Sequence, residues 1–472
     1  MTYEQFKDAC FALALEKGCE SAEIYSVTSD GFSVNVLNGE LDKYAVERSK
    51  GLNLRVLFEG KSGYAYTEVF EDPEVLVNHA IDNAKAIEST DENPMQGACE
   101  YPEIHEKPNP FVDLPEEEKI RLAMDLERDT LAYDPRVNRT EYCSVDTGVV
   151  ETHISNTLGL KANSTERYSY AVLGPILKDG DEEHCSFAFK FGPEITDYAG
   201  IIKESVENTL LEFNASTVDS GEYRILLRND AAGDLLSAFS SMFFAERVQK
   251  GLSLLTGKLG ETIASPAITI LDDPFEADNP RAFDAEGVPS VLTTVAENGV
   301  LKSYLYNLKS AKKDGVVSTS NAGRMGAAGA VTTAPSNFYI VKGEKSFDEL
   351  KAALGNGLII TEVSGLHAGL NPISGDFSLI ARGQLVENGE IVRSVDQITV
   401  AGNFLTMMQS IEAVGSDLRF GIPMGGIGKV SWRRERYPLQ YSGLENSMNC
   451  IVHGVAKSQT QLSNFHYSLD II

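Results

Sequence analysis

The histidines are the residues from which a hydrolytic metal site would most readily be built, and their spacing does not provide one. A helical zinc site needs two imidazoles about one turn apart, with a carboxylate beside the first, so that the metal is held from one helix face while the acid activates its water. The closest two of the seven histidines lie thirteen residues apart in the sequence. We therefore expect no metal, no other cofactor and no catalytic residue of this kind.

Other local patterns that could do chemistry are also incomplete. His367, in the glycine-flanked run SGLHAG, is the one histidine retained as a site candidate, although a loop histidine bonded to backbone explains it more simply. No GxSxG nucleophile turn is present, and the glycine-rich runs at 326–330 and 423–428 lack the Lys-Ser/Thr of a phosphate loop. Asp272 and Asp273 precede Pro274, and we interpret them as a solvated turn rather than a calcium site.

Composition narrows the class of protein. The 472 residues include 41 Lys and Arg against 69 Asp and Glu, a net charge of −28 that repels nucleic acid and anionic membrane surfaces. The six cysteines form no CxxC pair, which is typical of a reducing compartment. The first twenty residues mix charged and apolar positions, unlike a signal peptide, and no apolar run reaches 18 residues. We expect a cytoplasmic protein with neither nucleic acid nor a membrane as its partner.

The first predicted unit, residues 1–90, contains a sheet between two helices. Helices are predicted near 2–17 and 73–87, and alternating apolar and polar residues predict four strands, at 22–29, 31–47, 51–60 and 62–70. Asp30-Gly31, Asn38-Gly39 and Glu59-Gly60 are the turn signals between these strands. Four prolines in polar surroundings predict a linker at 91–112.

Two further units complete an α+β protein. The middle unit, 113–218, is predicted to have helices near 115–131 and 200–213, with strands at 139–156, 167–177 and 184–191 between them. The third unit, 219–430, begins with a strand near 221 and one helix from about 231 to 250. It then becomes rich in strands and glycines, which predicts a large, mostly antiparallel sheet or barrel.

The third unit carries a resemblance to a known family. The run from Leu235 to Pro274 (LLSAFSSMFFAERVQKGLSLLTGKLGETIASPAITILDDP), followed by FDAEGVPSVLTTVAENGVLKSYLYN, TAPSNFYI, GDFSLIARGQLVENGE and ITVAGNF in that order, resembles the TldD/PmbA family. The preceding units resemble it more loosely, and the match covers roughly residues 1–428. The ordered series is specific, whereas each piece alone is weak.

The resemblance implies one of two subunit types. TldD-like members carry a zinc-binding HExxxH helix, and PmbA-like (TldE) members do not. Where the zinc-binding pattern has His, Glu and His, this chain has Ser237, Ala238 and Met242. The cysteine ligand expected after Gly-Ser-Asp (415–417) is also absent, because its position falls near Ile427. The chain therefore resembles the PmbA/TldE-type subunit.

The resemblance further implies a TldD-like zinc metallopeptidase as partner, in a heterodimer that cleaves unfolded or leader peptides during peptide maturation. Members were first described as modulators of DNA gyrase, acting through such peptides rather than on DNA. We expect this chain to form the non-metal wall of the peptide cleft, with Arg324, Ser336, Asn337 and His367 as candidates, unless these residues only satisfy turns. The alternatives are a peptide-binding or chaperone-like protein without proteolysis, and a stand-alone hydrolase with an unrecognised site.

The tail from residue 431 departs from the family pattern. It holds the only tryptophan, and its run PLQYSGLENSMNCIVHGVAKSQTQLS resembles a translated mammalian interspersed repeat. The sequence thus suggests a gene of bacterial type joined to foreign sequence. We expect residues 431–472 to be poorly ordered, and the loss of a final core strand to leave a sheet edge uncovered.

Overall fold

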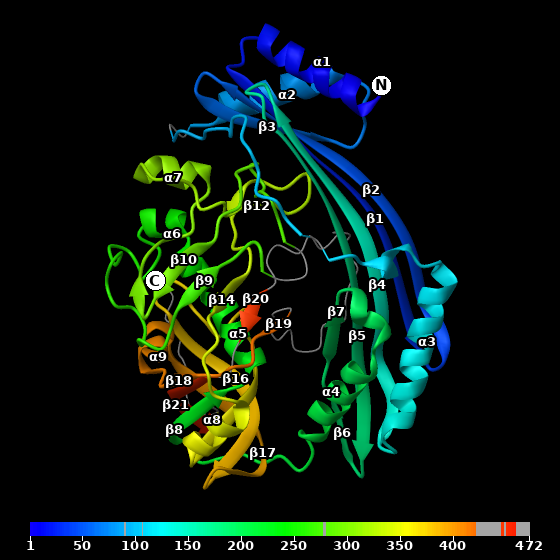
Figure 1. Cartoon of the computed structure of the whole chain (residues 1–472), viewed down its shortest axis with the longest axis vertical. Coiled ribbons are helices and arrows are strands. Elements are labelled where there is room, and N and C mark those ends of the chain that lie inside the picture. The colour runs from blue at the N-terminus through cyan, green and yellow to red at the C-terminus, as the bar shows by residue number, and fades with distance from the viewer. Residues whose placement is uncertain (89–90, 106, 277–279, 422–444, 448–449, 459–472) are drawn as a thin grey trace, which may run out of the picture.

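The computed structural model describes residues 1–88, 91–105, 107–276, 280–421, 445–447 and 450–458 of the chain. Figure 1 shows a long, curled sheet beside a C-terminal domain of shorter strands and helices. The expected α+β class is confirmed. Among the described residues, no helix is both long and apolar enough to cross a membrane.

The curled sheet has seven strands among the described residues, in the order β3-β2-β1-β4-β5-β6, with β7 also paired to β5. Its strands are β1 (Ser21–Leu37), β2 (Glu40–Phe58), β3 (Lys61–Thr67), β4 (Val137–Asn156), β5 (Lys161–Asp179), β6 (Glu182–Cys185) and β7 (Ala188–Phe191). Its helices are α1 (Tyr3–Glu16), α2 (Pro73–Ala86), η1 (Pro110–Asp113), α3 (Glu116–Tyr133), η2 (Pro193–Thr196) and α4 (Ala199–Leu210).

Two of the three predicted turns connect these strands, and the third does not. Asn38 and Gly39 have positive φ and join Leu37 to Glu40 in a two-residue hairpin, as Glu59 and Gly60 join Phe58 to Lys61. Asp30-Gly31 instead lies inside β1, with Gly31 opposite Glu47 of β2 and Gly148 of β4. The prediction of a turn there was wrong because pairing on both sides keeps this dipeptide extended.

The curled sheet is shared by the two units expected at 1–90 and 113–218, and its two ends have separate cores. Ala22 and Ile24 of β1 pack with α1 and α2, whereas Val34 and Val36 pack with α3 and α4. These four positions are all even-numbered, so they lie on the same side of β1. Tyr25, on the opposite side, belongs to a third cluster that includes Phe283 of the C-terminal domain. One sheet thus connects all three predicted units.

The C-terminal domain contains a larger and a smaller sheet. The smaller sheet has the order β11-β10-β9-β14, and β12 and β13 pair separately. Their bounds are β9 (Ile270–Asp272), β10 (Thr293–Glu297), β11 (Val300–Leu301), β12 (Ala322–Gly323), β13 (Thr332–Thr333) and β14 (Phe338–Ile340). The larger sheet contains β8 (Gly221–Leu227), β15 (Gly357–Ser364), β16 (Asp376–Glu387), β17 (Glu390–Asn403), β18 (Ala413–Val414) and β21 (Cys450–Ser458).

The larger sheet closes on itself, because β21 pairs with both β8 and β17. All its ladders are antiparallel except β15 with β8, so the expected mostly antiparallel sheet or barrel is present. The tail was expected to leave a sheet edge uncovered, but its residues 450–458 form β21, which pairs along β8, since the alternating run CIVHGVAKS can form a strand. Within the 431–472 tail only 445–447 (β20, paired with β19) and 450–458 are described, and the rest of that expectation lies outside the described residues.

The single helix predicted from about 231 to 250 is three short pieces. They are α5 (Asn229–Phe239), η3 (Ser240–Phe243) and α6 (Ala245–Gln249). The remaining helices of the domain are α7 (Leu308–Asp314), α8 (Phe347–Leu354) and α9 (Phe404–Ser410), and β19 spans Arg419–Gly421. Helical bonding stops because Leu305 donates its N–H to the Phe243 carbonyl and accepts the Ala245 N–H, both at 2.9 Å. Pairing with Leu305 thus turns the chain away from the α5 axis.

Candidate functional site

The positions at which the resemblance expects a zinc-ligand helix lie where α5 ends. Ser237 and Ala238 are half-buried in the last turn of α5, and Met242 is 1% exposed in the core formed by η3. A hydroxyl, a methyl group and a buried thioether do not fit Zn²⁺, which prefers imidazole, thiolate and carboxylate ligands. Within the described ranges, no three His, Cys, Asp or Glu side chains gather as a metal site. Ile427 lies outside the described residues.

One buried carboxylate lies a turn before these positions. Asp234 is 7% exposed, and burial raises its pKa to about 7, with the nearby charges of Asp230 and Glu362 acting in the same direction. Asp234 precedes Ser237 by three residues and Ala238 by four, so the three residues share one side of α5. This end of the helix therefore carries a carboxyl that is partly protonated at neutral pH.

The segment that follows Gly-Ser-Asp reaches the start of α5. Asn229 donates to the Asp417 carboxylate at 3.2 Å. Arg419 forms a paired contact with Glu204 of α4, with N···O distances of 2.6 and 2.9 Å, and lies 3.9 Å from Asp230. The structure thus brings the residues directly after Gly-Ser-Asp to the start of α5, with an Asn, an Arg and carboxylates in contact.

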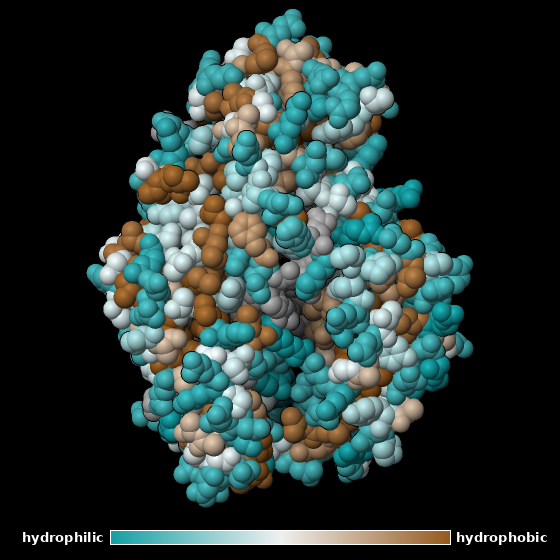
Figure 2. All heavy atoms as spheres, in the orientation of Figure 1, coloured by the Kyte–Doolittle hydropathy of each residue, from teal (hydrophilic) through white to brown (hydrophobic). Residues whose placement is uncertain are grey.

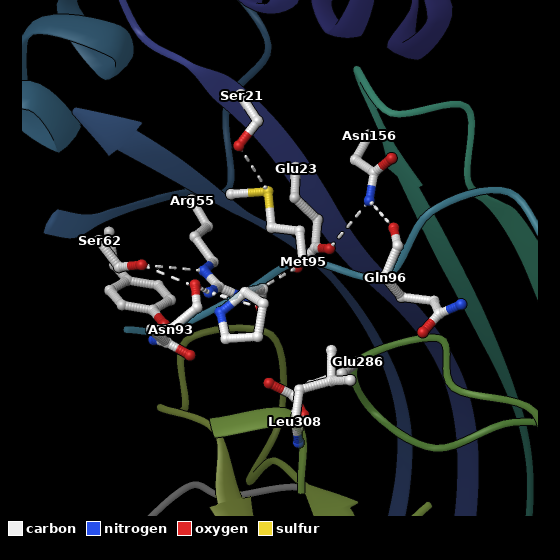
Figure 3. A network of polar contacts seen from close by, with 12 residues as sticks. Ser21, Glu23, Arg55, Ser62, Asn93, Met95, Gln96, Asn156, Glu286 and Leu308 are labelled. Atoms are coloured by element: carbon white, nitrogen blue, oxygen red, sulfur yellow. Dashed lines mark hydrogen bonds and ion pairs between the residues drawn. The ribbon is translucent and has the colours of Figure 1, made fainter. Parts of the chain in front are cut away.

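A second polar cluster joins the curled sheet to the C-terminal domain (Figure 3). Glu23 of β1 is almost fully buried and accepts from Asn156 of β4 at 3.3 Å. Arg55 of β2 is 1% exposed, lies 3.9 Å from Glu23 and donates to the carbonyls of Asn93 and Pro94 at 2.5 and 3.1 Å. The cluster therefore also fixes the polar stretch between the first and middle units.

Arg324 brings the C-terminal domain into this cluster. Its side chain is 1% exposed, its Nη2 lies 3.5 Å from the Glu23 carboxylate, and its guanidinium lies 4.5 Å from the ring centre of Tyr25. Its Nε and Nη1 have no hydrogen-bond partner among the described residues. The structure places Arg324, a candidate for the cleft wall, against β1, where its charge offsets that of Glu23.

Glu286 lies close to the same cluster, as Figure 3 shows. Its carboxylate accepts the Leu308 N–H at 2.8 Å, at the start of α7. Its pKa is raised to about 8, chiefly by burial and also by the charge of Asp284, while the charge of Arg55 acts in the opposite direction. Asp284 accepts the N–H groups of Glu286, Val288 and Ala322 at 2.9 to 3.0 Å, and burial raises its pKa as well.

Ser336 and Asn337 satisfy buried turns. Ser336 donates its hydroxyl and its N–H to Asp272, at 2.8 and 2.7 Å, and Asn337 donates to the carbonyls of Asp273 and Glu276. Asp272 is 1% exposed, so the prediction that it lies in a solvated turn was wrong: Ser336 and Asn321 supply the donors that compensate its burial. Asp273 does form the expected turn, since it accepts the Phe275 N–H.

His367 is separate from this network, being exposed in the loop between β15 and β16. Ser336 and Asn337 are linked to the β12–β13 pair, because Asn321 bonds both Asp272, the partner of Ser336, and the Ala334 carbonyl. Figure 2 shows the surface hollowed between the C-terminal domain and the curled sheet on this face. Sequence reasoning missed Glu23, Arg55 and Glu286, whose one signal was a charge placed among apolar strand and loop residues.

Comparisons with known proteins cover most of the chain. Profiles described as PmbA/TldA metallopeptidase domain 1, central domain and C-terminal domain match residues 22–86, 109–212 and 220–437. "Metalloprotease PmbA" of Escherichia coli O157:H7 is 27% identical over 88% of this chain and 92% of its own length. "Metalloprotease TldD homolog" of Haemophilus influenzae is 26% identical over 89% and 90%.

Solved structures agree with this assignment. A protein from Thermotoga maritima, described as a proposed modulator of a DNA gyrase, is 34% identical, with a TM-score of 0.84 over 96% of this chain and 100% of its own. TldE from Thermococcus kodakarensis, at 21% identity and a TM-score of 0.82, shares the fold over 96% of this chain and all of its own. With matching profiles in all three parts of the sequence and these relatives, the chain belongs to the PmbA/TldD metallopeptidase family.

Proposed function

We propose that this chain is the PmbA/TldE-type subunit of a heteromeric metallopeptidase, whose zinc chemistry is supplied by a TldD-like partner. The observation that carries the proposal is the end of α5, where Ser237, Ala238 and Met242 occupy the positions of the zinc ligands and the general base. None of these side chains is a zinc ligand of ordinary strength, and none can activate a water as a carboxylate does. Overall similarity does not decide the subunit type, because PmbA and TldD relatives match almost equally well.

In the complex, this subunit would contribute one wall of the cleft that holds unfolded or leader peptides. The exposed loop that carries His367 can contact a peptide without rearrangement of the core. Ser336, Asn337 and Arg324 would act indirectly, by holding the loops near β12 and β14 against the curled sheet. A cytoplasmic location suits both the substrates and the cysteine usage proposed above.

Zinc analysis together with paired assays tests the proposal. The purified chain is expected to contain well below one zinc per chain and to leave an unfolded test peptide intact. When it is co-expressed with a TldD-like subunit, we expect the two to co-purify and the pair to cleave the peptide. Stoichiometric zinc or unaided cleavage by this chain would favour the stand-alone hydrolase instead.

A variant pair tests the cleft wall separately. His367→Ala is expected to raise the KM of the complex for the peptide several-fold while kcat changes little, because the loop binds substrate but performs no chemistry. His79→Ala on α2, also an exposed histidine, is the matched control and should leave both constants unchanged. If this chain binds the peptide and co-expression brings no cleavage, the chaperone-like alternative is the better description.

A further inference from the structure

A row of aromatic side chains follows the strands β5 and β7 of the curled sheet. Tyr168 and Tyr170 of β5 have ring centres 6.2 Å apart, and the Tyr170 ring centre lies 6.0 Å from that of Phe191 of β7. Phe189 continues the row, with its ring centre 6.3 Å from that of Phe191 and the two planes 10° apart. All four side chains are half-buried. We call these four residues the aromatic strip.

Strand register places the aromatic strip on the face of the sheet that meets the C-terminal domain. Phe191 lies opposite Tyr170, which lies opposite Asp146 of β4, and Asp146 lies opposite Ser33 of β1. Directly opposite residues share a face, and odd-numbered residues of β1 share the face of Tyr25, which packs against that domain. In Figure 1, β7 lies on the side of β5 nearest the C-terminal domain. The helices α3 and α4 pack on the opposite face.

Two glycines allow aromatic rings to lie over the backbone of this face. A Cβ atom at Gly148 would lie 2.5 Å from Cζ of Tyr168, and one at Gly174 would lie 2.6 Å from a ring carbon of Phe187. Side chains at these two positions would therefore displace the rings. Phe187 is 40% exposed and extends the aromatic surface beyond Phe189. A ring that lies on backbone directs its opposite face, rather than its edge, away from the sheet.

The charges on the same face are mostly negative. Asp146 lies directly opposite Tyr170, and burial raises its pKa to about 6, so it is ionised at about pH 8. Glu166 of β5 and Glu47 of β2 also lie on this face, together with the basic residue Lys43. The whole chain adds a net charge of −28. A segment that binds here is therefore favoured if it carries positive charge.

The aromatic strip lies beside the helix that contacts α5. Ala188 of β7 packs in one core with Ile201 of α4. Glu204, also on α4, is bound by Arg419, which lies 3.9 Å from Asp230 of α5. The strip and the α5 end discussed above are thus joined through α4. A peptide held by the strip would lie in the part of the molecule where the proposed cleft is expected.

The chemistry of the strip favours one class of peptide. Ring faces stack with other aromatic rings and attract the cations of lysine and arginine. In an extended peptide, alternate side chains point to the same side, with the spacing of Tyr168 and Tyr170, which are themselves two residues apart in one strand. Alternate aromatic side chains can therefore meet successive rings, while basic side chains offset the carboxylates around them.

We propose that the aromatic strip binds extended, positively charged peptide segments through their aromatic side chains, and that Asp146, Glu47 and Glu166 discriminate against acidic peptides. The inference names the class of peptide that the cleft takes, and in this respect it rests on the proposed function. It gives the curled sheet a part in choosing the peptide, which neither the α5 end nor the His367 loop provides.

Three matched peptides test the selectivity on the unmodified full-length chain. The first is a labelled peptide of alternating lysine and phenylalanine, the second has alanine in place of phenylalanine, and the third has glutamate in place of lysine. Fluorescence anisotropy at about pH 8, without zinc or a TldD-like subunit, should show the first bound at least about tenfold more tightly than either of the others. Its binding should weaken as NaCl is added.

Variants locate the binding on the strip. Phe191→Leu keeps an apolar side chain but removes a ring, and should weaken binding of the lysine-phenylalanine peptide about three- to tenfold. Asp146→Asn should narrow the difference between the basic and the acidic peptide. Tyr133→Leu, at a tyrosine 46% exposed at the end of α3, is the control and should change neither affinity. Circular dichroism and thermal unfolding verify the fold of each variant.

Three outcomes would overturn the proposal. They are an acidic peptide bound as tightly as the basic one, unchanged affinity in a folded Phe191→Leu variant, and binding that disappears as the concentration of the chain rises, which would mean that a second copy covers the strip. Binding is measured on the isolated chain, whereas the proposed function is tested by zinc content and by cleavage with a partner. The failure of one proposal is therefore distinguishable from the failure of the other.

Discussion

Buried carboxyls with raised pKa values occur, among other places, at the end of α5 and at the interface between the curled sheet and the C-terminal domain. Asp234 belongs to the first place, and Glu286 and Asp284 to the second. The two places differ in the groups that surround the buried carboxyls. Asp284 accepts three backbone N–H groups, whereas Asp234 lies between two other carboxylates. Asp234 is therefore the clearer source of pH-dependent stability.

Replacing Asp234 by Asn is expected to flatten the dependence of stability on pH. A folded-state pKa of about 7 lies above the ordinary value, so the stability due to this group is complete below about pH 4 and is lost as pH rises through 7. Relative to the unmodified chain, the Asp234→Asn variant should gain about 3 kcal/mol between pH 4 and pH 8 in urea unfolding. Asp8→Asn, at a side chain 75% exposed, is the control and should show no such trend.

The sequence located the candidate residues better than it described their surroundings. The absence of metal ligands at 237, 238 and 242 could be read directly, since it depends on residue identity alone. The burial of Asp272 could not, because its donors Asn321 and Ser336 come from segments about fifty or more residues away in the chain. Nothing in the sequence around Arg324 indicated its contact with Glu23, about three hundred residues earlier in the chain.

Among the elements, those defined by local chemistry followed the sequence closely. Thr2 caps α1 through a capping box with Gln5, and the Asn38-Gly39 hairpin lies where its turn signal predicted. The helix predicted at 231–250 failed because its interruption depends on backbone bonds to Leu305, which no local pattern reveals. The same is true of Asp30-Gly31, which is extended only because strands pair on both sides of it.

Two glycine substitutions should affect stability in opposite directions. Gly39→Ala is expected to destabilise the chain by about 1 kcal/mol, because φ is +74° at this hairpin position and a side chain is strained there. Gly200→Ala, in the first turn of α4 with open space around it, should instead stabilise by about 0.5–1 kcal/mol. Thermal or urea unfolding of both variants checks the signs, and two changes of equal sign would contradict this interpretation.

In η3, directly after α5, Met242→His is expected to destabilise the chain by about 2–4 kcal/mol in zinc-free buffer. The thioether is 1% exposed in an apolar core, where an imidazole would have no partner. Ser241→His, at the neighbouring half-buried position, is the control and should cost much less. A Met242→His variant as stable as the unmodified chain would show that residue 242 can turn towards solvent.

For the whole molecule, the buried ion cluster is one of the polar connections between the curled sheet and the C-terminal domain. Arg324→Met is expected to reduce the free energy of unfolding by about 2–4 kcal/mol, because Glu23 would keep only Arg55 at 3.9 Å as a charged partner. Arg139→Met removes an exposed pair with Glu183 and should change it by less than about 1 kcal/mol. If the two variants reduced the free energy of unfolding equally, the buried cluster would stabilise the chain no more than an exposed ion pair does.

The curled sheet takes strands from both the first and the second of the three units expected from the sequence. Periodicity located the strands, yet it could not show that β1 would lie between β2 and β4, because β4 begins 100 residues after the end of β1. Pairing between distant strands depends on complementary faces rather than on local signals. Homology supplied the overall arrangement, as the 34% identical structure from Thermotoga maritima covers 96% of this chain.

The long strands also have a mechanical consequence. Between the two cores of the curled sheet, an open hollow of about 440 Å³ is lined by Thr28, Asp30, Arg48, Ser49 and Lys50. Backbone pairing continues through this band, but no apolar cluster of the described residues includes these side chains. Side-chain packing by α1 and α2 and by α3 and α4 thus holds the two ends of the sheet, and backbone hydrogen bonds carry the continuity between them.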